Sequence, residues 1–332
     1  MYSIIISLFF KLTKFKSKTE ATMNKTDEII EEIKKVIHGK DEIIKLTLSA
    51  ILAGGHILLE DIPGVGKTTM AVAFSRTMNL DYKRMQFTPD VLPSDLVGFN
   101  MYDKSLGEFR FQPGAVYTNL FLADEINRTS PKTQSALLEV MEEKKASIEG
   151  VTRELEAPFF VIATQNPFGS SGTQRLPESQ LDRFMICLSI GYPDSTNAVM
   201  ILKGNSAKDL NTVNKILEKE ELIQLQTQAE NVHVEDVLYE YIVALTEQTR
   251  NSEIYELGLS PRGSLALLRM SKAYALIRGR DYLTPDDVLD TFLPVSIHRV
   301  KLSSKAKASG MILSETLINT AKSITIPNIN LK

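Results

Sequence analysis

The 332-residue sequence contains a single cysteine, Cys187, which excludes an internal disulfide bond. Cys187 lies in the apolar run from Phe184 to Ile190, a pattern that predicts a buried strand. A lone buried cysteine is typical of a reducing compartment, and we expect a cytoplasmic location. The sequence also lacks a basic excess, because its net charge is −3 and its pI is ≈ 5.9. This charge balance gives no sign of a nucleic-acid partner.

Metal-binding and membrane-spanning patterns are missing as well. The histidines are scattered: His38, His56, His233 and His298. None of them has metal-ligand spacing, so no structural metal is expected. Met1 to Phe10 is almost wholly apolar, but a membrane span needs ~20 residues, and neither the charges nor the cleavage site of a signal peptide are present. We therefore expect no stable membrane insertion. Residues 1–22 are interpreted as an extension outside the working domain, with Met23 as an alternative start.

The remaining sequence has an ordinary globular composition, with 43% hydrophobic and 24% charged residues. Its length suits two domains, or one domain with a lid. Up to Tyr192-Pro193, apolar strand patterns alternate with helical patterns, whereas only helical periods follow. This change predicts an α/β core over residues 23–192 and a helical domain over residues 193–332.

The central motif is a glycine-rich turn between a strand pattern and a helix pattern. The apolar run from Ile57 to Leu59 precedes the stretch Asp61-Ile62-Pro63-Gly64-Val65-Gly66-Lys67-Thr68-Thr69. Strand, glycine-rich loop and helix in this order predict a P-loop, whose backbone N–H groups and helix N-terminus surround a polyphosphate. Lys67 is expected to reach the β- and γ-phosphates of ATP, and the Thr68 hydroxyl to bind Mg²⁺. Asp61 stands where the usual pattern opens with glycine, and Asp tolerates turn conformations.

Two further strand ends carry side chains suited to nucleotide hydrolysis. The apolar run from Asn119 ends in Asp124 and Glu125. Asp124 is expected to hold Mg²⁺ through water, and Glu125 to orient or deprotonate the attacking water. Asn166 ends the next buried strand, and adjacent parallel strands end at the same crevice. There Asn166 is expected to position the water or contact the γ-phosphate; the alternative is that it caps the turn before Pro167.

Several residues outside these strand ends are candidates for contacts with a nucleotide. Arg262 follows Ser260-Pro261 in the first turn of a helix, where a cation opposes the helix dipole unless it meets a phosphate. Arg183 lies between a helix end and a buried strand, and is interpreted as an arginine finger for a neighbour's nucleotide or as a plain surface arginine. Arg128 is a rival for the trans-acting role. The backbone of His38-Gly39 is expected beside the adenine.

Together these motifs resemble the AAA+ ATPases of the MoxR type over roughly residues 25–300. The most specific stretch is Leu122-Ala123-Asp124-Glu125-Ile126-Asn127-Arg128-Thr129-Ser130-Pro131-Lys132-Thr133-Gln134. The other matching stretches are residues 86–90, 176–184 and 260–264. The resemblance implies a three-layer αβα P-loop core with a parallel sheet, an all-helical lid and a homo-oligomeric ring, with a hexamer expected.

The resemblance also assigns roles to single residues and to inserts. It makes Lys67 and Thr68 the Walker A pair, Asp124 and Glu125 the Walker B pair, Asn166 sensor 1, Arg183 the arginine finger and Arg262 sensor 2. The hairpins at 98–111 and 146–156 resemble inserts of this clade. Members are chaperone-like machines that mature or activate other complexes, often with von Willebrand factor A-domain partners.

The favoured function is Mg²⁺-dependent ATP hydrolysis that drives the remodelling of a protein client. The alternative is a nucleic-acid-stimulated motor, because related rings use similar hairpins on DNA. The hairpin tips, Asp103 to Gly107 and Ile148 to Gly150, carry no basic excess, whereas phosphate tracking needs Lys or Arg. No nucleic-acid partner is therefore expected. A non-hydrolysing scaffold is disfavoured because Glu125 and Asn166 are both present.

Overall fold

A five-stranded sheet forms the centre of the computed structural model, which describes residues 25–166, 176–202 and 210–328. Every neighbouring pair of these strands is parallel. The strand order is β2 (Tyr82–Gln86), β5 (Leu120–Asp124), β8 (Phe160–Gln165), β1 (Ile57–Glu60) and β9 (Ile186–Leu188). The apolar runs of the sequence supply these strands, because a strand covered on both faces needs a continuous apolar sequence. The extension over residues 1–22 and the loop that follows Asn166 lie outside the described residues.

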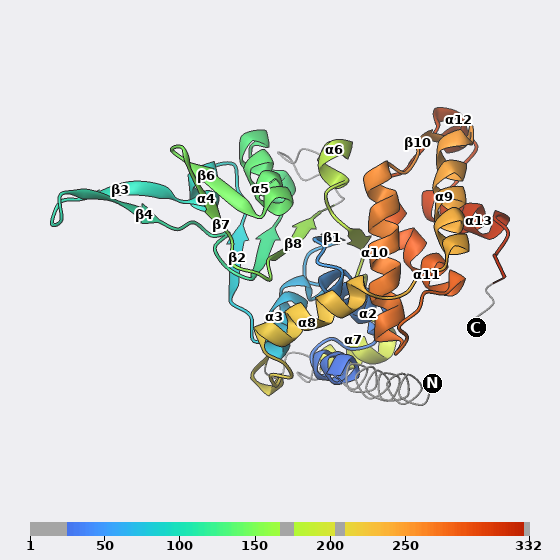
Figure 1. Cartoon of the computed structure of the whole chain (residues 1–332), viewed down its shortest axis with the longest axis horizontal. Helices are drawn as coiled ribbons and strands as arrows, with labels where there is room; N and C mark the ends of the chain where they lie inside the picture. Colours follow the sequence, from blue (N-terminus) through green and yellow to red (C-terminus); the bar gives the residue numbers. More distant parts are fainter. Residues whose placement is uncertain (1–24, 167–175, 203–209, 329–332) are drawn as a thin grey trace, which may run out of the picture.

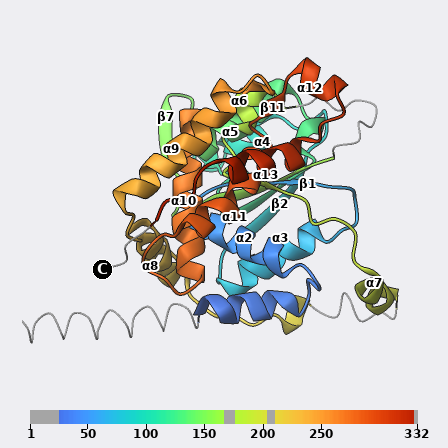
Figure 2. The same cartoon turned by 90° about the vertical axis from the view of Figure 1, so that its right-hand side faces the viewer.

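Helices cover both faces of the sheet, and alternate strand residues face different layers (Figures 1 and 2). Leu59 and Ile162 belong to the core cluster that contains α2 (Asp41–Leu52) and α3 (Lys67–Thr77). Leu58 and Ala163 belong to the opposite cluster, which contains α5 (Pro131–Glu143). The three-layer αβα core is therefore confirmed. Because the strands are parallel, all of them begin at one edge of the sheet and end at the other.

Local sequence signals account for two of the helices around the sheet. Helix α5 begins at Pro131, and the Ser130 side chain caps it by accepting a hydrogen bond from the Thr133 N–H at 3.2 Å. Residues 25–34 are helical, and Ile29 and Ile33 on their apolar side are fully buried. Each of these helices is thus fixed by its own cap or its own apolar stripe.

Two hairpins extend from the core. The short helix α4 (Pro93–Val97) leads into β3 (Phe99–Asp103) and β4 (Glu108–Gln112), and this hairpin protrudes far from the rest of the chain in Figure 1. The second hairpin, β6 (Lys145–Ile148) and β7 (Val151–Glu154), directly follows α5. Two contacts join the hairpins: the Arg153 guanidinium lies 4.0 Å from the centroid of the Phe111 ring, and Asn100 Nδ2 donates to Glu149 Oε2 at 2.7 Å. We refer to them below as the paired hairpins.

The chain beyond residue 176 is mainly helical. Its elements are α6 (Glu178–Leu181), α7 (Ser195–Leu202), the 3-10 turn Leu210–Thr212, α8 (Lys219–Glu230), α9 (Asp236–Asn251), α10 (Pro261–Ile277), α11 (Pro285–Ser296), α12 (Ser304–Ala308) and α13 (Leu313–Ser323). The helices-only pattern predicted past Tyr192 missed one antiparallel pair, β10 (Tyr255–Leu257) with β11 (Lys301–Leu302). A strand of two residues is too short to show a period in the sequence.

One buried arginine ties the C-terminal helices to the core. Arg299, three residues after the end of α11, is 5% exposed and donates from Nε to Asp182 Oδ1 at 2.8 Å and from Nη1 to the Met185 carbonyl at 3.0 Å. The Ser260 hydroxyl at the start of α10 donates to the same Asp182 carboxylate. These contacts hold the start of α10 against the edge of the sheet at which the strands begin. In the part of the chain that the structure describes, no helix is both long and apolar enough to cross a membrane.

Candidate functional site

The glycine-rich loop connects β1 to α3 and forms a cradle at the edge where the strands end. Gly64 and Gly66 have φ angles of 86° and 96°, a region that favours glycine, so the loop can turn back on itself. A Cβ added at Gly64 would meet no atom within 4 Å, so the space beside it is open. Gly66 is the N-cap of α3 and offers no side-chain cap, which leaves the first N–H groups of the helix for an anion.

The Lys67 amine closes this loop from inside. Its Nζ donates to the backbone carbonyls of Asp61 at 2.7 Å and Ile62 at 3.1 Å. Partial burial lowers the pKa of the Lys67 amine, and the nearby carboxylates of Asp124 and Glu125 oppose this shift. The ammonium is therefore already directed at the centre of the cradle, where an incoming phosphate can replace the two carbonyls.

Asp61, the departure from the usual glycine, has a structural task. Its side chain is 5% exposed and accepts hydrogen bonds from the Gly191 N–H at 2.7 Å, the Ile62 N–H at 2.9 Å and the Ser189 hydroxyl at 3.3 Å. The carboxylate thus anchors the first corner of the loop to the chain that follows β9. Asp61 therefore lines the cradle, while its carboxylate is bound by the loop and by the chain after β9.

The Asp124 carboxylate, at the end of β5, is bound on both oxygens. Oδ1 accepts a hydrogen bond from the Thr164 hydroxyl at 2.6 Å, and Oδ2 accepts from Arg84 Nη2 at 2.7 Å and Nε at 3.2 Å. The same Thr164 oxygen accepts the Glu125 N–H at 2.8 Å. Thr164 on β8 therefore fixes both carboxylate residues of β5 relative to the next strand.

Glu125 adopts a backbone conformation that is rare outside glycine, with φ 56° and ψ 49°. This turn ends β5 sharply and brings the Glu125 side chain to the cavity rather than onto the face of the sheet. Its Oε2 accepts from Arg128 Nη1 at 2.6 Å. Strained backbone of this kind is concentrated at functional sites, where the surrounding structure maintains it.

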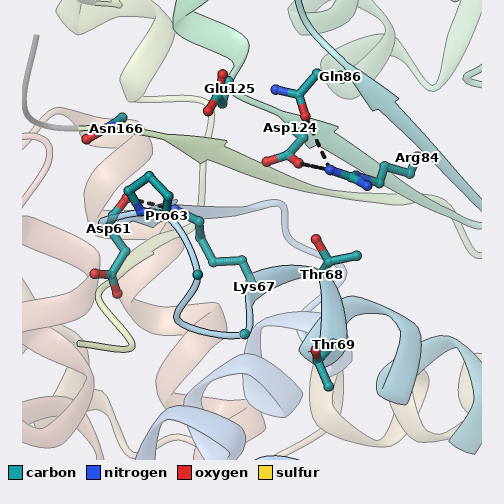
Figure 3. A pocket seen from close by; sticks show the side chains of 12 residues that line it. Asp61, Pro63, Lys67, Thr68, Thr69, Arg84, Gln86, Asp124, Glu125 and Asn166 are labelled. Carbon is teal, nitrogen blue, oxygen red and sulfur yellow. Dashed lines mark hydrogen bonds and ion pairs between the residues drawn. The ribbon is translucent and has the colours of Figure 1, made fainter. Parts of the chain in front are cut away.

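These residues line one cavity of ≈ 400 Å³, which we call the phosphate cavity (Figure 3). The lining residues are Asp61, Pro63, Gly64, Gly66, Lys67, Thr68, Thr69, Arg84, Gln86, Asp124, Glu125 and Asn166. The sequence predicted most of this set, and the structure brings Glu125 and Asn166 to the loop as expected. Arg84 and Gln86 also line the cavity, although the sequence motifs give them no role. They lie two positions apart on β2, so their side chains share one face of the strand.

A second cavity of ≈ 400 Å³ shares the loop residues Pro63, Gly64, Gly66 and Thr69 with the first. Its other walls include His38 and the apolar side chains of Ile37, Val65 and Ile190. A flat apolar ring such as adenine suits walls of this kind. Gly39 lies next to this cavity against Asn197, since a Cβ added to Gly39 would come within 2.3 Å of Asn197 Nδ2.

Arg183 and Arg262 lie together, away from the phosphate cavity. They line a cavity of ≈ 240 Å³ with His56 and Met185, which directly precede β1 and β9, so this arginine cavity lies at the edge where the strands begin. Both guanidinium groups pair with the Glu142 carboxylate, Arg183 at 2.9 Å. Lys144, Arg269 and Arg299 add further positive charge. Among the described residues, the arginine cavity and the phosphate cavity share no lining side chain.

The phosphate cavity fits a magnesium nucleotide on two grounds. The cradle presents backbone N–H groups and an ammonium to phosphates, and the Thr68 hydroxyl and Asp124 carboxylate are oxygen ligands of the type that Mg²⁺ prefers. Among the described residues there is no cluster of three or more His, Cys, Asp or Glu that could hold a metal.

A P-loop on a parallel sheet, with an Asp-Glu pair ending the neighbouring strand and a helical region beside it, defines a P-loop ATPase. The family model described as "ATPase family associated with various cellular activities (AAA)" matches residues 56–186, and the AAA lid domain model matches residues 247–320. The chain is an ATPase of this class.

Individual relatives extend the match over nearly the whole chain. YeaC of Bacillus subtilis, an uncharacterised protein, is 45% identical over 90% of this chain and 93% of its own length. Chaperone MoxR1 of Mycobacterium tuberculosis is 37% identical over 93% of this chain and 84% of its own. A crystal structure from Cytophaga hutchinsonii, provisionally described as an ATPase, is 36% identical with a TM-score of 0.88, and covers 96% of this chain and 99% of its own. The chain therefore belongs to the MoxR-type AAA+ ATPases, which confirms the family expected from its motifs.

Proposed function

We propose that each chain binds Mg²⁺ and ATP in the phosphate cavity and that a neighbouring chain completes the site for hydrolysis. In this proposal Lys67 and the loop N–H groups hold the β- and γ-phosphates, and Thr68 and Asp124 hold the Mg²⁺. Glu125 deprotonates or orients the attacking water, and Asn166 contacts the water or the γ-phosphate. The loop cavity that contains His38 holds the adenine.

The observation that carries this proposal is that the cavity lined by Arg183 and Arg262 is separate from the phosphate cavity. A strand of four residues spans about 13 Å, and the arginine cavity and the phosphate cavity lie at opposite ends of such strands. An arginine side chain on one edge therefore serves a nucleotide bound to another subunit. This arrangement favours Arg183 and Arg262 acting together in trans, in place of a sensor 2 role within one chain. Arg128 pairs with Glu125 of its own chain, which favours Arg183 over Arg128.

A homo-oligomeric ring, with a hexamer as the expected size, provides this contact between subunits. We further propose that residues 23–192 form the nucleotide-binding core and residues 193–332 the lid. The proposed location is the cytoplasm. The paired hairpins, which are joined to each other and follow β2 and α5, are suited to pass changes at the nucleotide to a protein client. One relative carries the name chaperone, which supports remodelling or maturation of such a client. A von Willebrand factor A-domain protein is the partner class that we propose.

Complementation between two inactive variants tests the shared site. Lys67→Ala removes the phosphate contact but keeps Arg183, whereas Arg183→Ala keeps an intact phosphate cavity. Mixed subunits should regain ATPase activity that neither variant shows alone, because a Lys67→Ala subunit supplies its arginine to an Arg183→Ala neighbour. If the mixture stays inactive although subunit exchange is demonstrated, the proposal of a shared site is wrong.

A second measurement separates the client-remodelling function from the nucleic-acid motor. The ATPase rate of the wild-type chain should not change when DNA or RNA is added, because the hairpin tips carry no basic excess. A several-fold stimulation that disappears at raised salt would support the motor instead.

A further inference from the structure

Arg84 is a cation within the phosphate cavity that belongs to the same chain as the P-loop. It lies on β2, and its backbone is opposite Leu122 of β5 in the sheet. Figure 3 shows Arg84 and Asp124 on the sheet side of the cavity, with Lys67 and Thr68 on the loop side. The guanidinium donates twice to Asp124 Oδ2, at 2.7 and 3.2 Å, and from Nη2 to Gln86 Oε1 at 3.2 Å. Arg84 is therefore bound to the residue proposed to hold the metal.

The two partners of the Asp124 carboxylate differ in how easily they can leave. The Thr164 hydroxyl, bound to Oδ1, belongs to a fully buried residue of β8 and also accepts the Glu125 N–H. The Arg84 side chain, bound to Oδ2, is 46% exposed and has a long flexible stem. A third partner that approaches Asp124 from the cavity therefore displaces Arg84 rather than Thr164.

The charges in the cavity change when a nucleotide and its metal arrive. Before they arrive, Arg84 neutralises Asp124. A divalent cation held near Asp124 would neutralise that carboxylate and repel the Arg84 guanidinium, and a terminal phosphate would offer the guanidinium new acceptors within the same cavity. Arginine is suited to this exchange, because its planar group of donors matches carboxylate and phosphate oxygens equally well.

We propose that Arg84 exchanges partners, from the Asp124 carboxylate to the terminal phosphate of the nucleotide bound by its own chain, when Mg²⁺ binds. Arg84 thus makes metal binding and recognition of the third phosphate depend on each other. This proposal rests on the proposed function, since it requires Mg²⁺ and ATP in the phosphate cavity. Arg84 would then bind the phosphate of its own chain's nucleotide, whereas Arg183 and Arg262 are proposed to act on the nucleotide of a neighbouring chain.

Equilibrium binding of ATP and ADP, measured by calorimetry over a range of Mg²⁺ concentrations, tests the exchange. In Arg84→Ala, Asp124 is released from its competitor, so half-saturation with Mg²⁺ should occur at a lower concentration than in the wild type. The preference for ATP over ADP at saturating Mg²⁺ should fall about tenfold or more, because a charge-assisted contact to the third phosphate is lost. Arg84→Lys keeps the charge without the paired donors and should retain part of that preference.

Lys83→Ala is the matched control. Lys83 precedes Arg84 in the same exposed edge strand, bonds the Gly114 carbonyl at 3.3 Å and does not line the cavity, so its loss removes one cation without touching the site. This control should bind both nucleotides and Mg²⁺ as the wild type does. If Arg84→Ala lowers only the melting temperature and leaves the Mg²⁺ midpoint and the ATP preference unchanged, Arg84 is a structural partner and the exchange is wrong. If the exchange fails in this way but the wild-type chain hydrolyses ATP, the proposed function still stands. If the wild-type chain binds no ATP, both proposals are wrong.

Discussion

The phosphate cavity and the arginine cavity are built from similar ion pairs but differ in what surrounds those pairs. In the phosphate cavity, Arg84 pairs with Asp124 beside a glycine-rich loop and a helix N-terminus. In the arginine cavity, Arg183 and Arg262 share the single carboxylate of Glu142, and no loop of backbone N–H groups is among the lining residues that the structure describes. The first cavity can enclose a polyphosphate. The second instead presents a cluster of arginine and lysine side chains, with the carboxylates of Glu142 and Asp182 among them, to a group that another molecule would bring.

In the proposed function, this difference divides the reaction between the two edges of one chain. The phosphate cavity uses the edge where parallel strands end, the usual location of ligands in such sheets. The arginine cavity uses the opposite edge, where Gly55 and Met185 lead into the strands and α10 approaches from the C-terminal region. If the proposed function holds, mutations should separate nucleotide binding from activation of hydrolysis.

Arg183→Ala gives the largest expected effect. An arginine supplied in trans is worth ~10³–10⁵-fold in related phosphoryl transfers, so kcat should fall on this scale while ATP affinity stays near that of the wild type. Single-turnover kinetics and calorimetric binding measure the two quantities. Lys145→Ala, which removes a nearby exposed cation outside the cavity, should leave both unchanged. A parallel loss of ATP affinity in Arg183→Ala would show that the two cavities are not separable.

Glu125→Gln tests the same division from the other edge. The variant should bind ATP but turn it over ~10²–10⁴-fold more slowly, because the general base is lost and the loop is intact. Lys67→Ala should instead lose nucleotide binding. Near-normal turnover by Glu125→Gln would exclude this residue from the catalytic role. Because the variant should stay bound to ATP, a pull-down with it in the presence of ATP should also retain the protein client.

His56, which lines the arginine cavity, should make the stability of the fold sensitive to acid. His56 accepts the Val161 N–H on Nδ1 at 2.9 Å and bonds the Met141 carbonyl through Nε2 at 2.9 Å, and burial lowers its pKa to about 4. The unfolded chain takes up a proton near pH 6.5 and the folded chain does not. The contribution of His56 to the free energy of unfolding is therefore fully present above pH 6.5. The free energy of unfolding decreases by ~3 kcal/mol as the pH falls towards 4.

Urea denaturation at pH 7.5 and pH 5 measures this loss of stability. His56→Gln should reduce the difference between the two pH values, since it removes one of the groups that protonate on unfolding. Part of the difference should remain, because burial also lowers the pKa of His298. An unchanged pH dependence in His56→Gln would show that His56 is already protonated, or exposed, in the folded chain.

Glu142→Gln gives the smallest expected effect. It removes the shared carboxylate from two half-exposed arginines, and exposed pairs contribute only about 0.2–1 kcal/mol. Arg183 and Arg262 then become more available to a neighbour. The protein concentration at half-maximal ATPase rate should therefore fall by up to about fivefold, with little change in melting temperature. A rise in this concentration would show that Glu142 itself makes a contact between subunits.

The sequence predicted those parts of the site that depend on local order. Strand, glycine-rich turn and helix occupy consecutive residues, so the cradle around Lys67 could be located without knowledge of the fold. The Asp-Glu pair and Asn166 could be placed because they end apolar strands. Arg84 could not, because its partner Asp124 becomes a neighbour only once β2 and β5 lie side by side in the sheet.

The same limit applies to residues that join distant elements. Glu142 on α5 meets Arg262 on α10 across 120 positions, and neither residue is unusual in its own segment. The corner at Asp61 was predicted from turn chemistry, but its bond to Gly191 depends on the position of the chain after β9. The two residues of β11 are extended because they pair with β10, and two residues are too few to predict a strand from the sequence.

The joint between the paired hairpins has a mechanical consequence. The β3–β4 arm is anchored near its base by the contacts of Phe111 with Arg153 and of Asn100 with Glu149, whereas Tyr102 and Phe109 further out are largely exposed. An arm of five-residue strands is a lever about 17 Å long, so a rotation of about 10° at its base displaces the tip by roughly 3 Å. With the joint as its fulcrum, a tilt of α5 by that angle would move the tip by about the rise of one residue in an extended chain.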